Sequence, residues 1–376
     1  MQFRDLKKQY EVLKPKIDAG IQATIENSAF ILGKPVTELE NKLAEYTGRK
    51  HCITCASGTD ALVLALKAYN VGAGDAVFVP DFTYIASASC ASLVGATPIF
   101  VDIDSNTFNM DPAALDNAIE KTVKEEKLTA KAIIPVDLFG QPANFDEINK
   151  IAEKYGLFIL EDAAQGFGGS IHEKKAGSFG DISATSFFPA KPLGCYGDGG
   201  AIFTDDDEID TRIRSLRAGG RSLEDKYNNC EIGINSRLDT IQAAVLLAKF
   251  DTFINKEIDA VNEVARWYTE RLQGVVETPV VLDDYVSSWA QYTIRLNDKE
   301  QRNNMQTELK VAGIPSMIYY PRGMHQQQAF KGMKLTDDNY PNTAKAADTV
   351  LSLPMHPYLD EVTVDMICSE IKNILK

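Results

Sequence analysis

The most regular feature of the chain is an alternation of short apolar runs with longer stretches of helical periodicity. Apolar side chains recur at spacings of three and four over residues 5–28 and 37–46, which predicts two amphipathic helices. Seven runs then have the length and composition of strands: residues 51–55, 76–80, 97–102, 132–136, 157–160, 183–188 and 200–204. Helical stretches lie between most of them, at residues 59–66, 85–94, 112–126 and 145–155. This alternation predicts an α/β fold with a mainly parallel central sheet flanked by helices.

The pattern changes in the last third of the chain. A long amphipathic helix, a half-exposed strand and two further helices are expected at residues 239–270, 289–296, 299–312 and 361–375. A chain of 376 residues exceeds the size at which one hydrophobic core usually stops growing. We therefore expect a large α/β domain over residues 1–249 and a smaller α+β domain over residues 250–376.

Composition and charge narrow the class of protein. The formal net charge of −14 argues against nonspecific binding to nucleic acid or to an anionic membrane. The first residues contain no secretory apolar region, and no run of about 18 apolar residues suggests a membrane span. Cys52 and Cys55 form a CxxC pair inside an apolar run, without a second pair at metal spacing. We expect buried reduced thiols, no metal site and a cytoplasmic location.

One lysine stands between an apolar run and a glycine-rich loop. Lys191 lies between Pro189 and Pro192, and four glycines occur in the eight residues from 194 to 201. Prolines bias the backbone away from helix, and glycines allow tight turns close to a ligand. A lysine held in this way is a candidate amine nucleophile for Schiff-base chemistry, as in enzymes that use pyridoxal 5'-phosphate (PLP). The alternative is a solvent-exposed lysine in a surface loop.

A polar turn between the first predicted strand and the next helix is a candidate phosphate site. Residues 57–60 read Ser-Gly-Thr-Asp. A helix N-terminus offers free N–H groups, which bind anions, although the same residues are also typical helix caps. A nicotinamide oxidoreductase would carry GxGxxG at this position, and this chain does not.

Further candidates follow the later strands. Asp162 follows the apolar run at residues 157–160 and Glu161, and it could pair with a pyridinium nitrogen, cap the next turn or hold a metal. Gln165 could hydrogen-bond the ring oxygen, and Ser186 could complete the phosphate site. Tyr84 could stack on a flat ring or belong to the core. Lys191 lies 29 residues after Asp162 (191 − 162), and this order of phosphate site, carboxylate and lysine is typical of fold-type I PLP enzymes.

The chain resembles the DegT/DnrJ/StrS family of PLP-dependent nucleotide-sugar aminotransferases over essentially its whole length. The resemblance is carried by the motifs at residues 56–62, 161–165, 186–194, 233–239 and 352–357. It implies that Lys191 forms the covalent link to PLP. It also implies that the ring and phosphate contacts are made by Asp162 (ring nitrogen), Gln165 (ring hydroxyl), Tyr84 (ring face), and Gly58, Thr59 and Ser186 (phosphate).

The resemblance also implies partners. Asn235 would reach the phosphate from the neighbouring subunit of a homodimer, and Arg237, Tyr319 and Tyr320 would lie near a nucleotide-linked keto sugar. Glutamate would donate the amino group in a ping-pong reaction through pyridoxamine phosphate. The tail motif, the glycine-rich run after Lys191 and the Tyr319-Tyr320 site favour the subgroup that aminates the 3-keto form of UDP-N-acetylglucosaminuronic acid.

Alternatives stay open at this stage. Relatives commonly carry a histidine where Tyr319 stands, so another UDP- or TDP-keto sugar is an alternative substrate. Sugar 3-dehydratases of this fold carry a histidine in place of the lysine, so Lys191 favours transamination over dehydration. An alternative from a different class is a non-catalytic regulatory protein that retains the PLP fold.

Overall fold

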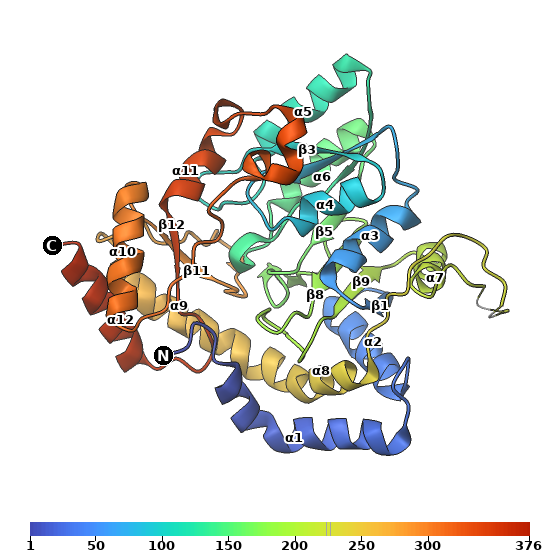
Figure 1. The fold of residues 1–376 in the computed structure, drawn as a ribbon, viewed down its shortest axis with the longest axis horizontal. Helices are drawn as coiled ribbons and strands as arrows, with labels where there is room; N and C mark the ends of the chain where they lie inside the picture. The colour runs from blue at the N-terminus through green and yellow to red at the C-terminus, as the bar shows by residue number, and fades with distance from the viewer. Residues whose placement is uncertain (223, 226) are drawn as a thin grey trace.

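The chain folds around one seven-stranded sheet (Figure 1). The computed structural model describes residues 1–222, 224–225 and 227–376. Strand β9 is antiparallel to both of its neighbours, and the other paired strands of the sheet run parallel. This confirms the mainly parallel sheet that the short apolar runs predict. Across the sheet, the order is β1 (His51–Cys55), β9 (Gly200–Thr204), β8 (Ile182–Ser186), β5 (Phe158–Asp162), β4 (Thr129–Ile133), β2 (Asp75–Pro80) and β3 (Thr97–Val101).

Both faces of the sheet are buried under helices. Side chains of successive strand residues point to opposite faces, so β2 supplies two different cores. Val77 and Val79 belong to one core, and Ala76 and Phe78 belong to the other. The first core includes residues of α3 (Gly58–Ala68), α4 (Ala86–Leu93) and α7 (Asp207–Leu216). The second includes residues of α5 (Pro112–Glu125) and α6 (Phe145–Tyr155).

Three helices cover the β1 end of the sheet. Leu39 and Leu43 of α2 (Lys34–Thr47) share a core with Phe203 of β9 and Phe250 of α8 (Thr240–Thr252). Helix α1 (Leu6–Asn27) lies along α8 at the bottom of Figure 1, and these two helices share a smaller apolar cluster. Both N-terminal helices therefore lie where the 3–4 periodicity predicts them.

The predicted connecting helix at residues 239–270 is interrupted by a π-turn. Helix α8 continues into η2 (Phe253–Glu257) and then α9 (Ile258–Leu272). π-turns inside α-helices occur frequently at functional sites. Here the turn carries a buried carboxylate, Glu257, which is 5% exposed.

The C-terminal elements build a further core of their own. Strand β11 (Tyr292–Arg295) pairs antiparallel with β12 (Val350–Leu353). Residues of α9, α10 (Lys299–Val311) and α12 (Glu361–Ile374) pack against this ribbon. The division into domains at residue 250 stays a prediction. The remaining elements are short: η1 (Leu138–Gly140), β6 (Ser170–Ile171), β7 (Lys174–Lys175), β10 (Tyr285–Val286), η3 (Met324–Gln326), η4 (Gln328–Met333), η5 (Asp337–Asn339) and α11 (Pro341–Thr349).

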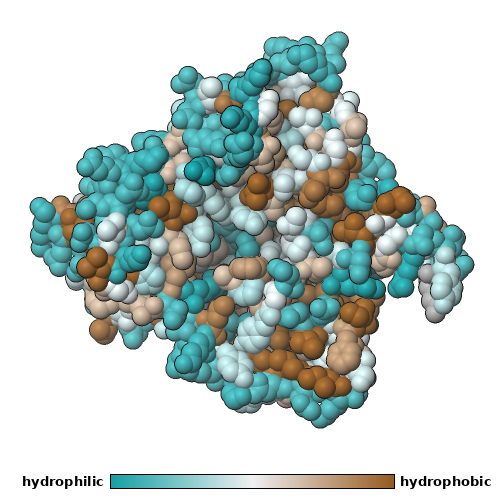
Figure 2. All heavy atoms as spheres, viewed as in Figure 1, coloured by the Kyte–Doolittle hydropathy of each residue, from teal (hydrophilic) through white to brown (hydrophobic). Residues whose placement is uncertain are grey.

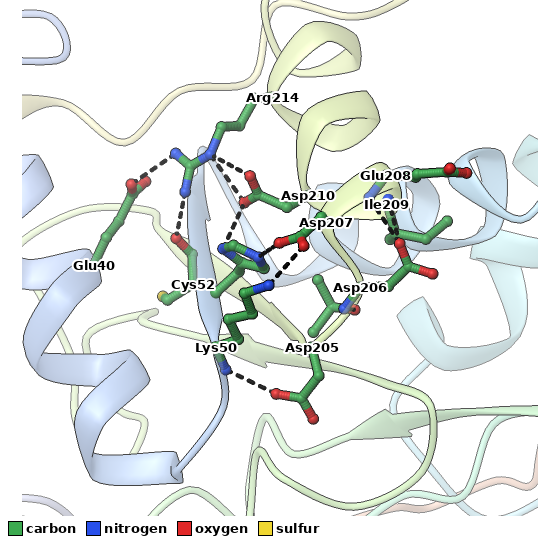
Figure 3. Close-up of polar contacts among 12 residues, drawn as sticks. Glu40, Lys50, Cys52, Asp205, Asp206, Asp207, Glu208, Ile209, Asp210 and Arg214 are labelled. Carbon is green, nitrogen blue, oxygen red and sulfur yellow. Dashed lines mark hydrogen bonds and ion pairs between the residues drawn. The ribbon is translucent and has the colours of Figure 1, made fainter.

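A buried ion network fixes the end of β1 that leads into α3. The carboxylate of Glu40 accepts hydrogen bonds from the Thr54 amide at 2.9 Å, from Arg214 at 2.9 Å and from Arg217 at 2.8 Å. Figure 3 shows Arg214 between Glu40 and Asp210. Burial alone would raise the pKa of the Glu40 carboxyl group. The positive charges of Arg217 and Arg214 outweigh this effect, so the net result is a lowered pKa. The network joins α2, β1 and α7, although the sequence analysis did not predict α7.

The described surface is mixed in polarity. In Figure 2, apolar atoms gather over the lower part of the molecule, where α1 and α8 lie in Figure 1. Ile25, Phe30 and Ile31 are each between 45% and 48% exposed. Among the described residues, no helix combines the length and the apolar character needed to cross a membrane.

Candidate active site

A cavity of about 350 Å³ opens at the carboxyl ends of the parallel strands. In open α/β sheets, this edge is where ligands bind. Each strand that ends here delivers lining residues: β1 through residues 57–59, β2 through 83–84, β4 through 136, β5 through 162 and β8 through 186. Nine predicted site residues line the cavity: Gly58, Thr59, Tyr84, Asp162, Gln165, Ser186, Lys191, Tyr319 and Tyr320.

Lys191 and Asp162 face the same cavity and influence each other's charge. Burial lowers the pKa of the Lys191 amine, while the carboxylate of Asp162 opposes that shift. Burial raises the pKa of Asp162, while the Ser87 hydroxyl and Lys191 oppose that shift. Asp162 is only 5% exposed and accepts hydrogen bonds from Ser87 Oγ at 2.7 Å and from the Ala164 amide at 3.2 Å. Burial thus favours the neutral form of both groups, while their mutual attraction favours the charged forms.

The N-terminus of α3 forms one wall of the cavity. Ser57 caps this helix, because its hydroxyl accepts a hydrogen bond from the Asp60 amide at 3.1 Å. Gly58 packs tightly against Ser186, so that a Cβ at residue 58 would lie 2.7 Å from the Ser186 Cβ. A helix N-terminus presents N–H groups and a partial positive charge. Ser57 therefore caps the helix, which was the alternative to a phosphate site. This capping does not prevent the same wall of the cavity from binding an anion.

Tyrosines and an amide form the opposite part of the lining. Gln165 accepts a hydrogen bond from the Phe139 amide at 2.9 Å and donates one to the Tyr320 hydroxyl at 3.1 Å. The rings of Tyr84 and Tyr320 lie 6.4 Å apart, and Tyr84 is 54% exposed. Tyr84 is therefore not a core residue, and its proposed stacking on a ring stays a prediction.

Some lining residues are absent from the sequence-based prediction. Ser87 is the nearest of them to the chemistry, because it donates to Asp162. Asp198 and Gln291 also line the cavity. Ser87 lies near the start of α4, a helix of small residues without a motif, so only the fold, which brings it to Asp162 at the end of β5, identifies it.

Asn235 and Arg237 do not line this cavity. Asn235 is exposed and forms an isolated β-bridge with Ala218, and Arg237 is half-buried. Between them, Ser236 donates to Asp60 at 2.6 Å and accepts from the Ala56 amide at 3.0 Å. The segment is thus anchored beside the α3 N-terminus while its two predicted functional side chains lie outside the cavity.

The CxxC pair is part of the core. Cys52 and Cys55 lie in β1 and are at most 2% exposed, and burial raises the pKa of both thiols. Within the described ranges, no group of three or more His, Cys, Asp or Glu side chains is arranged to hold a metal ion.

Comparison with known proteins identifies the family. The model of the DegT/DnrJ/EryC1/StrS aminotransferase family matches residues 12–372. The chain is 46% identical over 374 residues to the UDP-2-acetamido-2-deoxy-3-oxo-D-glucuronate aminotransferase of Pseudomonas aeruginosa, covering 99% of this chain and 100% of the relative. It is 41% identical over 372 residues to the UDP-N-acetyl-3-dehydro-alpha-D-glucosamine 3-aminotransferase of Acidithiobacillus ferrooxidans, covering 99% and 97%.

Solved structures agree with this result. A DegT DnrJ EryC1 StrS aminotransferase from Brucella abortus superposes with a TM-score of 0.96 at 47% identity, covering 99% of both chains. NtdA from Bacillus subtilis with bound cofactor PMP superposes with a TM-score of 0.86 at 28% identity, covering 96% of this chain and 82% of that chain. The chain therefore belongs to the DegT/DnrJ/EryC1/StrS aminotransferase family and is a PLP-dependent nucleotide-sugar aminotransferase.

Proposed function

We propose that the protein transfers an amino group from glutamate to the 3-keto group of UDP-2-acetamido-2-deoxy-3-keto-glucuronic acid by a ping-pong mechanism. The observation that carries the proposal is one cavity that holds an amine, Lys191, a buried carboxylate, Asp162, and the N-terminus of α3. These three features match the aldehyde, the ring nitrogen and the phosphate of PLP in turn.

The residues of the cavity fit this cofactor. Asp162 is held by two donors and can still accept a further hydrogen bond from a protonated ring nitrogen. Gly58 and Ser186 lie in direct contact, and with Thr59 they offer a small-residue wall to a phosphate. When bound, PLP supplies an electron sink for the carbanion that forms when the donor loses its α-proton.

Lys191 performs the proton transfers in this proposal. An amine acts as a nucleophile and as a base only when neutral, and burial lowers the pKa of Lys191 toward that state. The same amine takes the proton from the α-carbon of glutamate and delivers it to the cofactor carbon. Asp162 keeps the charge of the ring nitrogen fixed throughout, without moving.

A second copy of the chain completes the site in this proposal. The phosphate, the diphosphate and the sugar carboxylate together carry several negative charges, yet among the described residues that line the cavity, Lys191 is the only Lys or Arg. We propose a homodimer in which Asn235 of the neighbouring subunit reaches the phosphate and Arg237 reaches the sugar nucleotide. The exposed Asn235 supports this, and so do the exposed apolar side chains of Phe30 and Ile31, which adjoin residues 239–240.

The choice of sugar rests on the relatives. Two of them act on 3-keto UDP-sugars that differ at one carbon, a carboxylate in the glucuronate and a hydroxymethyl group in the glucosamine. The identity is higher to the glucuronate aminotransferase, 46% against 41%. Tyr319 and Tyr320 line the cavity and are proposed to contact the sugar nucleotide.

The test is amination of matched substrates by the PLP-loaded enzyme with glutamate as donor. UDP-3-keto-N-acetylglucosaminuronate is compared with its neutral glucosamine counterpart and with TDP-keto sugars, and the amino-sugar product is measured by mass spectrometry. We expect kcat/KM to be at least about tenfold higher for the uronate. Equal or lower kcat/KM contradicts the substrate assignment. No product from any keto sugar, with normal PLP binding, favours the regulatory alternative.

A further inference from the structure

Two cations hold the loop of Lys191 from outside the cavity. Arg4 Nη2 donates to the backbone carbonyl of Lys191 at 2.9 Å and to that of Pro192 at 3.3 Å. Lys249 Nζ donates to the carbonyl of Gly194 at 2.7 Å, and Lys249 is 1% exposed. Neither cation lines the cavity. Three carbonyls within four residues are therefore fixed by two side chains from elements far apart in the sequence.

Removing the positive charges of Arg4 and Lys249 from water costs folding free energy. Burial lowers the pKa of Arg4 to about 10 and that of Lys249 to about 8, while Glu257 opposes both shifts. Glu257 lies in the π-turn and accepts hydrogen bonds from Gln9 at 3.0 Å and from Tyr358 at 2.5 Å. A buried charge destabilises the folded state unless it is paired and hydrogen-bonded. The loop carbonyls hydrogen-bond both cations, and the negative charge of Glu257 offsets part of the cost of burying them.

Arg4 also lies on a segment that touches the predicted sugar-binding tyrosines. The carbonyl of Phe3 accepts a hydrogen bond from the Met355 amide at 3.1 Å. The ring of Phe3 packs edge-on against Tyr319, with 6.2 Å between centroids. The N-terminal segment is thus held between the Lys191 loop and the C-terminal core.

We propose that Arg4 and Lys249 are positioning residues for Lys191, which fix the carbonyls of its loop so that the amine stays directed into the cavity. The loop contains prolines and glycines but no helix or strand, so its conformation depends on such external contacts. The inference rests on the proposed function only for the chemical role of Lys191.

The two cations act differently on the amine itself. Burial lowers the pKa of Lys191, and the positive charge of Arg4 lowers it further. The carboxylate of Asp162 acts in the opposite direction and raises it. Arg4 is itself faced by Glu257 and Tyr358, and its charge also acts on Lys249. Removing the charge of Arg4 therefore moves the titration of Lys191 to higher pH. Removing Lys249 loosens the loop without this shift.

The first measurement is hydrogen exchange in the cofactor-free protein. Arg4→Met and Lys249→Met are compared with Lys7→Met, because Lys7 is an exposed cation of the same N-terminal region. The reporters are the amides of Lys191 and Cys195, which donate to Phe188 and Phe187. Loss of a charge-assisted hydrogen bond predicts at least about tenfold faster exchange in both test variants. The Lys7 variant is expected to match the wild type.

The second measurement is the pH dependence of amine labelling at Lys191, read by peptide mapping. Arg4→Met is expected to shift the labelling curve to higher pH, whereas Lys249→Met leaves it in place. Arg4→Lys keeps the charge and is expected to keep the wild-type curve while exchange accelerates only in part. This conservative variant preserves the test if Arg4→Met does not fold.

Two outcomes overturn the proposal. One is wild-type exchange in both Arg4→Met and Lys249→Met, together with a wild-type labelling curve in Arg4→Met. The other is equal acceleration of exchange in the loop and in the buried strand β5, which indicates a loss of global stability. Because both measurements use cofactor-free protein, they are independent of the proposed function, which instead fails if the wild type forms no PLP adduct on Lys191.

Discussion

Replacing Asp162 by asparagine removes one negative charge from the cavity while keeping the shape of the side chain. Ser87 donates to Asp162 Oδ2 at 2.7 Å and the Ala164 amide donates to Oδ1 at 3.2 Å, so the single amide oxygen of asparagine keeps one of these two hydrogen bonds. Lys191 faces the same cavity and loses the anion that raises its pKa. The substitution therefore tests electrostatics with little change in packing.

The expected magnitude follows from the burial of the carboxylate. Asp162 is 5% exposed, so water screens its charge poorly. A unit charge pair about 4 Å apart at an effective dielectric constant of about 20 interacts by roughly 4 kcal/mol, and a charged hydrogen bond is worth about 1.5–3 kcal/mol. These values correspond to a loss of about 10- to 10³-fold. We expect a loss of about 10²- to 10³-fold in kcat, which is typical of a preorganised electrostatic partner.

Two assays separate this electrostatic effect from a general loss of structure, because turnover should fall while Lys191 becomes reactive at lower pH. Turnover with glutamate and a keto sugar is expected to fall, because the ring nitrogen loses its partner. In cofactor-free protein, amine labelling of Lys191 is expected to move to lower pH, because the group that raises its pKa is gone. A variant that was merely misfolded would lose turnover, but its Lys191 would not become reactive at lower pH.

The matched control is Asp198→Asn. Asp198 lines the same cavity but is exposed, so solvent screens its charge. We expect a loss of less than about tenfold in kcat for this variant. The reasoning is refuted if Asp162→Asn retains more than a third of the wild-type kcat, or if both variants lose activity equally.

Three further predictions concern the dimer, acid stability and the phosphate wall. Mixed subunits of Asn235→Ala and Lys191→Ala should recover activity that each homodimer lacks; no recovery in dimers that form normally contradicts a site shared between subunits. Burial lowers the pKa of His356 to about 4, so the folded state binds fewer protons than the unfolded state between pH 4 and 6.5, and stability falls as pH drops through that window. Replacing His356 by asparagine should remove up to about 3 kcal/mol of this pH dependence in denaturant titrations, and an unchanged slope argues against a neutral buried histidine. Gly58→Ala places a Cβ 2.7 Å from that of Ser186 and should weaken PLP binding at least about tenfold, measured by cofactor titration; unchanged affinity argues against this wall as the phosphate site.

Elements with a strong local pattern could be predicted from the sequence. Most strands of the sheet coincide with a short apolar run, and in β2 both alternating faces are buried, which explains why no polar alternation is visible there. Strand β4 begins at Thr129, before the predicted run at residues 132–136, and includes Lys131. The cavity lining was predictable in large part because Gly58, Asp162 and Ser186 lie at or just after strand ends, and parallel strands bring those ends together.

Features that depend on distant contacts could not be predicted in the same way. Strand β12 exists because Val350–Leu353 pairs with β11, more than fifty residues away (350 − 295 = 55). Helix α7 is rich in charge, and it is fixed by Arg214 and Arg217 on the buried Glu40 of α2. The π-turn at Phe253–Glu257 leaves the apolar pattern of the long helix unbroken, so periodicity alone does not reveal it.

The same limit applies to the site. Ser87 has no motif, and only the fold brings its hydroxyl to Asp162. Arg4 and Lys249 belong to none of the motifs found in the sequence, and their contacts with the Lys191 loop appear only in the fold. Asn235 and Arg237 lie outside the cavity of one chain, so their roles stay predictions that concern a second copy.

The most direct test of the central claim is to locate the cofactor on the chain. The PLP-loaded protein is reduced with borohydride, digested and mapped by mass spectrometry, with and without prior addition of glutamate. The account predicts a PLP adduct on Lys191 alone, which glutamate abolishes by converting the cofactor to its amino form. An adduct on another lysine, or an adduct on Lys191 that glutamate and other amino donors leave unchanged, would contradict it.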